Sequence, residues 1–169
     1  MAFYTNSSMI GVDLNTPGAD QLFALGTTVR GSDGSIWQYV VAAASCSAYS
    51  VVGINASASM SQLVLANIDS GSGRQIAVCQ ANFSASAYGW VPIHGGAAAN
   101  GVFKVNVSGS ATLGLDFYIT TGSGSRLTTT AAASGTIKGI TLATATEAWV
   151  GITAVACIIT WPRVNTLGS

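Results

Sequence analysis

Hydrophobic and polar residues alternate in several short stretches of this chain. In residues 102–109, VFKVNVSG, every second side chain from Phe103 to Val107 is apolar, and residues 113–120, LGLDFYIT, repeat the pattern. A period of two places apolar side chains on one face of a strand and polar side chains on the other. Both stretches therefore predict β-strands with one buried face.

Further stretches rich in Val, Ile and aromatic residues predict more strands. They cover residues 35–43, 49–55, 62–68, 74–83, 87–93, 136–145 and 147–161. Turn-forming sequences such as GSDGS, DSGSGR, HGG, VSGSA and TGSGS lie between the strands. No apolar stripe with helical spacing persists. Residues 57–69 are the one segment where a helical turn competes with a strand, and the strand is preferred.

About nine strands without helices predict an all-β fold, in which sheet edges must be closed or covered. We expect a single antiparallel β-sandwich, jelly-roll-like in character, with a barrel as the other way of closing the edges. Residues 1–24 are polar, contain Pro17 and Gly18, and alternate poorly. They predict an extended N-terminal arm, followed by the β-sandwich domain in residues 25–169.

The scarcity of charge indicates what kind of surface the protein has. Charged residues make up 7% of the 169 residues, and six acidic residues balance six basic ones, whereas ordinary soluble domains have roughly 25% charged residues. Such a surface suits a protein whose faces are covered by neighbours. There is no basic patch for nucleic acid, no apolar run long enough for a membrane and no secretory signal. We therefore expect neither nucleic acid nor a membrane as a partner, and we expect the protein to be made in the cytoplasm.

His94, the only histidine, lies in AYGWVPIHGG, residues 87–96. A general base needs a reacting group within reach and, usually, an orienting carboxylate. The carboxylates are Asp13, Asp20, Asp33, Asp69, Asp116 and Glu147. None lies near His94 in sequence. Because Pro92 cannot donate a ladder hydrogen bond, we expect this strand at a sheet edge or near its end, with His94 in a turn or an interface. We expect no catalytic residue, no metal site and no cofactor, and the protein is not expected to be an enzyme.

Two glycine-containing motifs have simple structural explanations. Residues 31–35, GSDGS, lack the alternating ligands and distal Glu of a calcium loop, so they predict a hairpin turn at Asp33-Gly34. Residues 71–74, GSGR, lack the Lys-Ser/Thr of a phosphate-binding loop and precede a strand. Neither motif predicts a ligand site.

The cysteines and tryptophans also favour structural roles. The three cysteines are Cys46, Cys79 and Cys157. Their number is odd and their spacing does not fit a metal site, which predicts buried free thiols. The four tryptophans are Trp37, Trp90, Trp149 and Trp161. They could form a carbohydrate platform, but without clustered polar partners we expect them in the core or in an oligomer interface.

The strand expected at residues 147–161 is apolar at both odd and even positions. A strand of a two-layer sandwich buries only one face, so something must cover the other. Because the sequence offers no helix for this, we expect a second subunit. The candidate oligomer-interface residues are Trp149, Ile152, Ala154 and Ile158.

Residues 22–96 resemble the small accessory head proteins encoded beside major capsid genes in tailed phages. The resemblance lies in a Leu-Gly-Thr opening at Leu25, an Asp33-Gly34 turn before an aromatic strand, and the later Tyr-Gly-Trp-Val of residues 88–91. It implies a capsid decoration, or cement, protein of jelly-roll-like fold. Such a protein binds the major capsid protein on the outer surface of the virion head as an oligomer, here expected to be a homotrimer. In the arm, Phe3, Tyr4 and Met9 are the candidate capsid-binding residues.

Two other functions compete with capsid decoration. A tail-tip or fibre domain that binds a host receptor is also all-β and oligomeric, and an exposed aromatic cluster with glycan binding would favour it. A glycan-active enzyme would need two carboxylates facing each other across a cleft, at a separation of roughly 5–10 Å.

Overall fold

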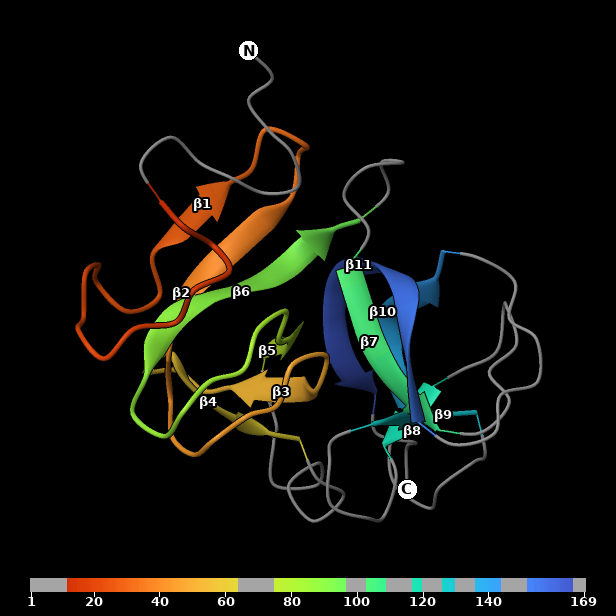
Figure 1. Cartoon of the computed structure of the whole chain (residues 1–169). Helices are drawn as coiled ribbons and strands as arrows, with labels where there is room; N and C mark the ends of the chain where they lie inside the picture. The colour runs from red at the N-terminus through yellow and green to blue at the C-terminus, as the bar shows by residue number, and fades with distance from the viewer. Residues whose placement is uncertain are drawn as a thin grey trace.

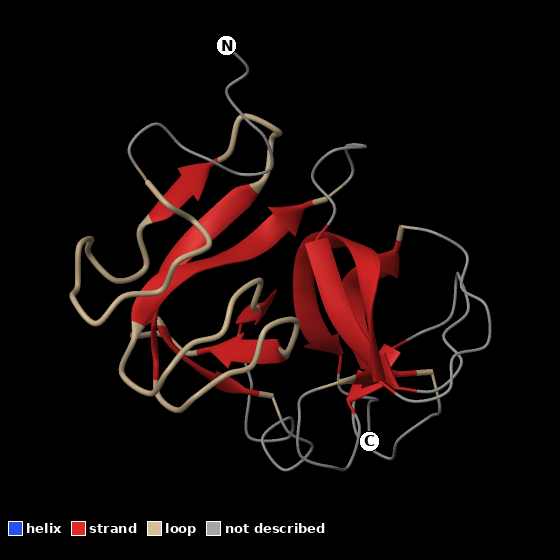
Figure 2. Cartoon of the chain, viewed as in Figure 1, coloured by secondary structure: helices blue, strands red, loops and turns tan. Residues whose placement is uncertain are grey.

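The computed structural model describes residues 12–63, 75–96, 103–108, 117–119, 126–129, 136–143 and 152–165. In this part of the chain, strands and turns alternate and no helix occurs (Figure 2). None of it forms a helix long and apolar enough to cross a membrane. The strands are β1 Thr28–Arg30, β2 Ile36–Ala42, β3 Val51–Ile54, β4 Ser59–Gln62, β5 Gln75–Val78, β6 Tyr88–Gly95, β7 Phe103–Ser108, β8 Phe117–Ile119, β9 Leu127–Thr128, β10 Thr136–Leu142 and β11 Ile152–Asn165.

All 11 strands belong to one mixed sheet. The all-β class and the mostly antiparallel pairing are therefore confirmed. Two pairings are parallel, β2 with β4 and β7 with β9, and neither was expected from the pattern of alternation. The strand expected at residues 62–68 is not found as such: β4 covers Ser59–Gln62, Leu63 follows it outside the strand, and residues 64–68 lie outside the described part.

The predicted turn at Asp33-Gly34 joins β1 to β2. Gly34 has a φ of 82°, a left-handed conformation that glycine adopts without strain. The Asp33 carboxylate accepts hydrogen bonds from the Ser35 backbone N–H (3.0 Å) and the Ser35 hydroxyl (2.6 Å). The Trp37 indole N–H in turn donates to Ser35 Oγ at 2.8 Å. A chain of hydrogen bonds therefore anchors the turn to a fully buried tryptophan.

The N-terminal part of the sheet is built around β2. Strand β6 pairs antiparallel with β2 from Tyr88 to His94, while β1 and β4 pair with different parts of the other edge. Strands β4, β3 and β5 continue the sheet beyond β2 (Figure 1). β2, β3 and β6 are buried on both faces, which explains their nearly continuous apolar sequences.

The C-terminal part closes into a ring of five strands. β7 pairs with β11, β11 with β10, β10 with β8, β8 with β9, and β9 with β7. In Figure 1 these strands stand together beside the N-terminal part. Closure gives each of the five strands at least two partners among the described residues, and such pairing protects sheet edges.

The two parts join where β6 meets β11. Gly95 pairs with Ile159, and His94 pairs with Thr160. A second link covers the edge of β7: the Lys104 N–H donates to Gln80 Oε1 (3.0 Å), and Gln80 Nε2 donates to the Lys104 carbonyl (3.1 Å). Both parts therefore form one continuous sheet around a shared core.

The expected alternation is confirmed in β7, where Phe103, Val105 and Val107 are buried and Lys104 is exposed. Phe103 contacts the Trp37 ring, with centroids 5.4 Å apart, and so packs the ring of five strands against β2. Trp37 and Trp90 lie in the core, as predicted.

Residues 12–24 of the expected arm lie against the sheet. Gly18 and Tyr88 exchange two backbone hydrogen bonds of 2.9 and 2.8 Å, and Leu14 is buried. The Phe23 ring contacts Tyr39 and Trp90 at centroid distances of 5.3 and 5.2 Å. This segment therefore covers the outer aromatic face of β2 and β6. Residues 1–11 lie outside the described part.

The structure corrects four expectations about strands β6 and β11. β6 is not an edge strand, because it pairs with β2 along most of its length and with β11 at its end; Pro92 is accommodated where the β2 register shifts. His94 lies within β6 and not in a turn. β11 does not stop before Pro162 but continues to Asn165. Trp161 is not in the core, and the oligomer interface, its other expected place, stays a prediction.

Candidate functional site

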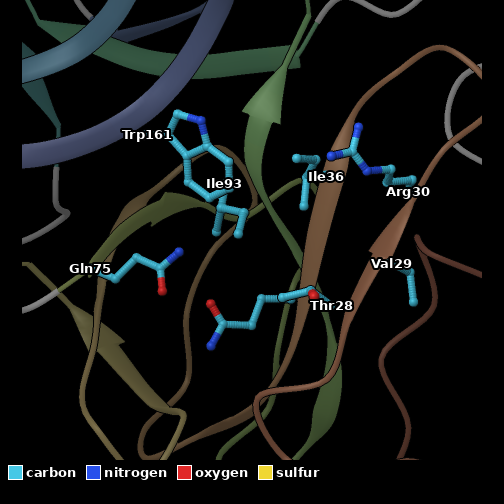
Figure 3. Close-up of a pocket in the computed structure, with 8 residues that line it drawn as sticks. Thr28, Val29, Arg30, Ile36, Gln75, Ile93 and Trp161 are labelled. Carbon is cyan, nitrogen blue, oxygen red and sulfur yellow. The ribbon is translucent and has the colours of Figure 1, made fainter.

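A groove with a volume of about 500 Å³ lies where strands from both parts of the sheet approach one another (Figure 3). Its apolar lining comes from Val29 on β1, Ile36 on β2, Ile93 on β6 and Trp161 on β11. Its polar lining consists of Thr28, Arg30, Gln38 and Gln75. Figure 3 shows the Trp161 indole beside Ile93, with Gln75 to one side and Ile36 and Arg30 to the other. This arrangement combines an aromatic surface with flanking hydrogen-bonding groups.

Trp161 reaches the groove because β11 bulges at this point. Lys138 pairs with Arg163 and Ile140 with Ile159, so Gly139 alone lies opposite three residues of β11. A bulge of this kind inverts the faces of the strand beyond it. Val155, Cys157 and Ile159 point inward before the bulge, whereas Pro162 is buried after it and Trp161 is 52% exposed.

The backbone at the bulge is in an uncommon conformation. Trp161 has a φ of 48°, which is rarely adopted by bulky side chains. Gly139 has a φ of 82°, and a Cβ atom there would overlap the Thr160 carbonyl oxygen. Strained conformations persist where the surroundings enforce them, and they are frequent at binding sites.

His94 holds the indole from the neighbouring strand. The imidazole of His94 stacks on Trp161 with ring centroids 5.4 Å apart and an interplanar angle of 28°. Its Nδ1 is buried and has no hydrogen-bond partner within the described residues. Among the described residues, His94 therefore supports Trp161 by packing against its indole ring.

None of the described carboxylates, Asp13, Asp20 and Asp33, lines the groove, and Asp13 and Asp33 have structural partners. Hydrogen bonds from the Thr16 hydroxyl and the Asn15 backbone lower the pKa of Asp13 below its ordinary value. Asp33 holds the first turn, as described above. No group of three or more His, Cys, Asp or Glu side chains in residues 12–63, 75–96 and the later described segments could hold a metal ion.

All three cysteines are free and buried, as expected. A hydrogen bond between the thiols of Cys46 and Cys79 lowers the pKa of Cys46 and raises that of Cys79, whose burial adds to the rise. Burial alone raises the pKa of the Cys157 thiol to about 12. These thiols act as small apolar groups of the core at neutral pH.

The expected oligomer face of β11 is only partly described. Ala154 and Ile158 are half-buried on the outer face of the strand, and their cross-strand neighbours Asn106 and Thr141 are polar. Trp149 and the side chain of Ile152 lie outside the described residues, as do Phe3, Tyr4 and Met9 of the arm. The oligomer and capsid-binding assignments stay predictions.

The groove residues escaped the sequence analysis for different reasons. Thr28, Gln38 and Gln75 are ordinary polar positions of strands, with no motif around them. The Trp161 bulge did have a signal: Pro162 and Gly139 lie in opposing strands, and both residue types mark bulges. Comparisons with protein-family models, curated proteins and solved structures find no match to this chain.

Proposed function

We propose that this chain is a structural virion protein, a capsid decoration protein that binds the outer surface of a phage head and stabilises the shell. Its partners are the major capsid protein and further copies of itself, most simply in a trimer as the resemblance implies. It needs no catalytic residue, cofactor, nucleic acid or membrane for this role. The jelly-roll-like sandwich implied by the resemblance remains part of the proposal.

The observation that supports this proposal most is that both halves of the resembling pattern meet in the fold. The turn at Asp33-Gly34 leads into β2, and the Tyr-Gly-Trp-Val segment begins β6, its direct neighbour. Tyr39 and Trp90 are cross-strand partners with ring centroids 5.0 Å apart. The residues that carry the resemblance therefore lie together in one packed unit of the fold, as we expect if the resemblance reflects a shared fold.

The low charge of the chain supports a clamp on a large assembly. A protein that binds the closed shell and not its dissociated subunits stabilises the shell by mass action. The interior of a long-lived interface is depleted in charged residues, which suits a chain with 7% charged residues.

Binding to empty shells tests the proposal. Shells assembled from the major capsid protein of the proposed phage should bind this protein saturably in sedimentation, and bound shells should disassemble at a higher temperature. The simultaneous changes Phe3→Ala, Tyr4→Ala and Met9→Ala should weaken this binding and leave the melting temperature of the free protein unchanged. Absence of saturable binding to intact shells would contradict decoration.

The oligomer is tested separately. Ala154→Glu places a charge on the outer face of β11, where burial in an interface without a partner is unfavourable. Light scattering after size exclusion should show an oligomer for the wild type and for the control Ser84→Glu, which changes an exposed residue. The Ala154→Glu protein should run as a monomer or aggregate, and a monomeric wild type at high concentration would refute self-association.

A receptor-binding tail domain is the second candidate, and one observation favours it. Trp161 is a large exposed aromatic residue over a groove with polar walls. Protein that co-purifies with isolated tails and not with heads would favour this candidate over decoration.

A further inference from the structure

The groove at Trp161 has the size and lining of a ligand site. Its volume of about 500 Å³ lies within the roughly 300–1,000 Å³ usual for small-molecule sites. Apart from Leu22 on the arm segment, Trp161 is the only large hydrophobic residue of the described chain that is exposed. The indole is fixed there by the β11 bulge, the left-handed backbone and the stacked His94 ring. Such immobilisation lowers the entropy lost when a ligand binds.

The polar walls of the groove determine which ligands fit. Gln38 and Gln75 each carry a donor and an acceptor, whereas Arg30 only donates. Gln38 Oε1 is buried and accepts no hydrogen bond from the described residues. A buried acceptor without a partner is unfavourable, so a ligand that donates a hydrogen bond to it gains affinity. Gln38 lines the groove, and because the terminal torsion of glutamine is broad, its amide is free to present Oε1 to a ligand there.

These groups match a sugar better than an anion or a nucleic acid. An anionic phosphate or carboxylate only accepts hydrogen bonds and cannot satisfy Gln38 Oε1. A nucleic acid strand needs a basic path for its backbone, and Arg30 is the one charged residue of this lining. A pyranose ring has an apolar C–H face for the indole and hydroxyl groups at its rim that both donate and accept.

We propose that the groove is a saccharide-binding site. A pyranose ring packs against the Trp161 indole, and its hydroxyl groups exchange hydrogen bonds with Gln38, Gln75 and Arg30. The proposal does not depend on where the chain sits in a virion, so it can hold for a head protein and for a tail protein alike.

Titration of the ¹⁵N-labelled protein with maltotriose, chitotriose, mannotriose and galactotriose tests the proposal. At least one sugar should shift the indole N–H resonance of Trp161 saturably, with the resonance assigned from its loss in Trp161→Gly. That variant removes the indole and suits the fold, because glycine adopts the positive φ without strain. It should raise the Kd by roughly tenfold or more, because the apolar face of the sugar loses its contact with the indole. Gln75→Ala should also weaken binding.

Leu22→Ala is the matched control, since it removes the other exposed large apolar side chain. Its Kd should stay within about twofold of the wild type, well below a tenfold step of 1.4 kcal/mol. The proposal is overturned if none of the sugars shifts the Trp161 resonance, or if Trp161→Gly binds sugar as the wild type does. It is equally overturned if Trp161→Gly abolishes binding to empty shells while no sugar binds, because the groove is then a protein-docking site.

Discussion

Replacing Ser35 by alanine tests the turn that carries one wall of the groove. The Ser35 hydroxyl accepts a hydrogen bond from the Trp37 indole N–H at 2.8 Å and donates one to Asp33 at 2.6 Å. Neither Ser35 nor Trp37 is accessible to solvent, so water cannot replace the lost hydroxyl. Ser35→Ala therefore leaves a buried indole N–H without a partner.

The expected loss of stability follows from these two bonds. A buried donor left without a partner costs about 1–3 kcal/mol, and a hydrogen bond to a charged group contributes about 1.5–3 kcal/mol. Asp33 keeps its bond from the Ser35 backbone N–H and is only half-buried. We therefore expect Ser35→Ala to lower the free energy of unfolding by about 2–4 kcal/mol, which lowers Tm by about 4–16 °C in a chain of this size.

Urea denaturation, followed by fluorescence, measures this loss. Ser32→Ala is the matched control in the same turn, because Ser32 is exposed, and it should change the free energy of unfolding by less than about 0.5 kcal/mol. In a Trp37→Phe background the donor is absent, so Ser35→Ala should cost at least about 1 kcal/mol less. An equal cost in both backgrounds, or a cost near that of Ser32→Ala, would refute the explanation from the indole hydrogen bond.

Three further predictions concern the core and the bulge. The pKa of the Cys157 thiol is 9.0 in the unfolded chain and about 12 in the folded one. The free energy of unfolding should therefore keep its full value below pH 9.0 and fall by up to about 1.4 kcal/mol per pH unit above it. Cys157→Ala should lack this component in urea titrations over that pH range, and an unchanged slope would contradict it. Gly139→Ala should lower stability by about 1–3 kcal/mol, whereas Gly18→Ala, with open space around it, should stay within about 0.5 kcal/mol of the wild type. His94→Ala should cost about 0.5–1.5 kcal/mol and alter Trp161 fluorescence; a silent variant would show that the stacked rings do not support each other.

The parts of the fold that local sequence determines were predictable. Phe103, Val105 and Val107 alternate with polar residues, and that periodicity alone assigns their buried face. The turn at Asp33-Gly34 was predictable because glycine tolerates the left-handed conformation required there.

The closed ring and the groove were not predictable, because they depend on contacts between distant residues. Periodicity places Trp161 on the same face as Ile159, yet the bulge opposite Gly139 turns it outward. His94 lies in the sheet and not in a turn because β2 and β11 both pair with it. Long-range pairing of this kind leaves no local pattern in the sequence.

The most direct test of the proposed function is a cryo-EM map of the phage particle that is proposed to carry this chain. Decoration predicts density for the β1–β2 hairpin, β6 and the ring of five strands on the outer surface of the head, repeated at symmetry-related positions and in contact with the major capsid protein. Density for the chain at the tail tip, or a head surface without it, would contradict the proposal.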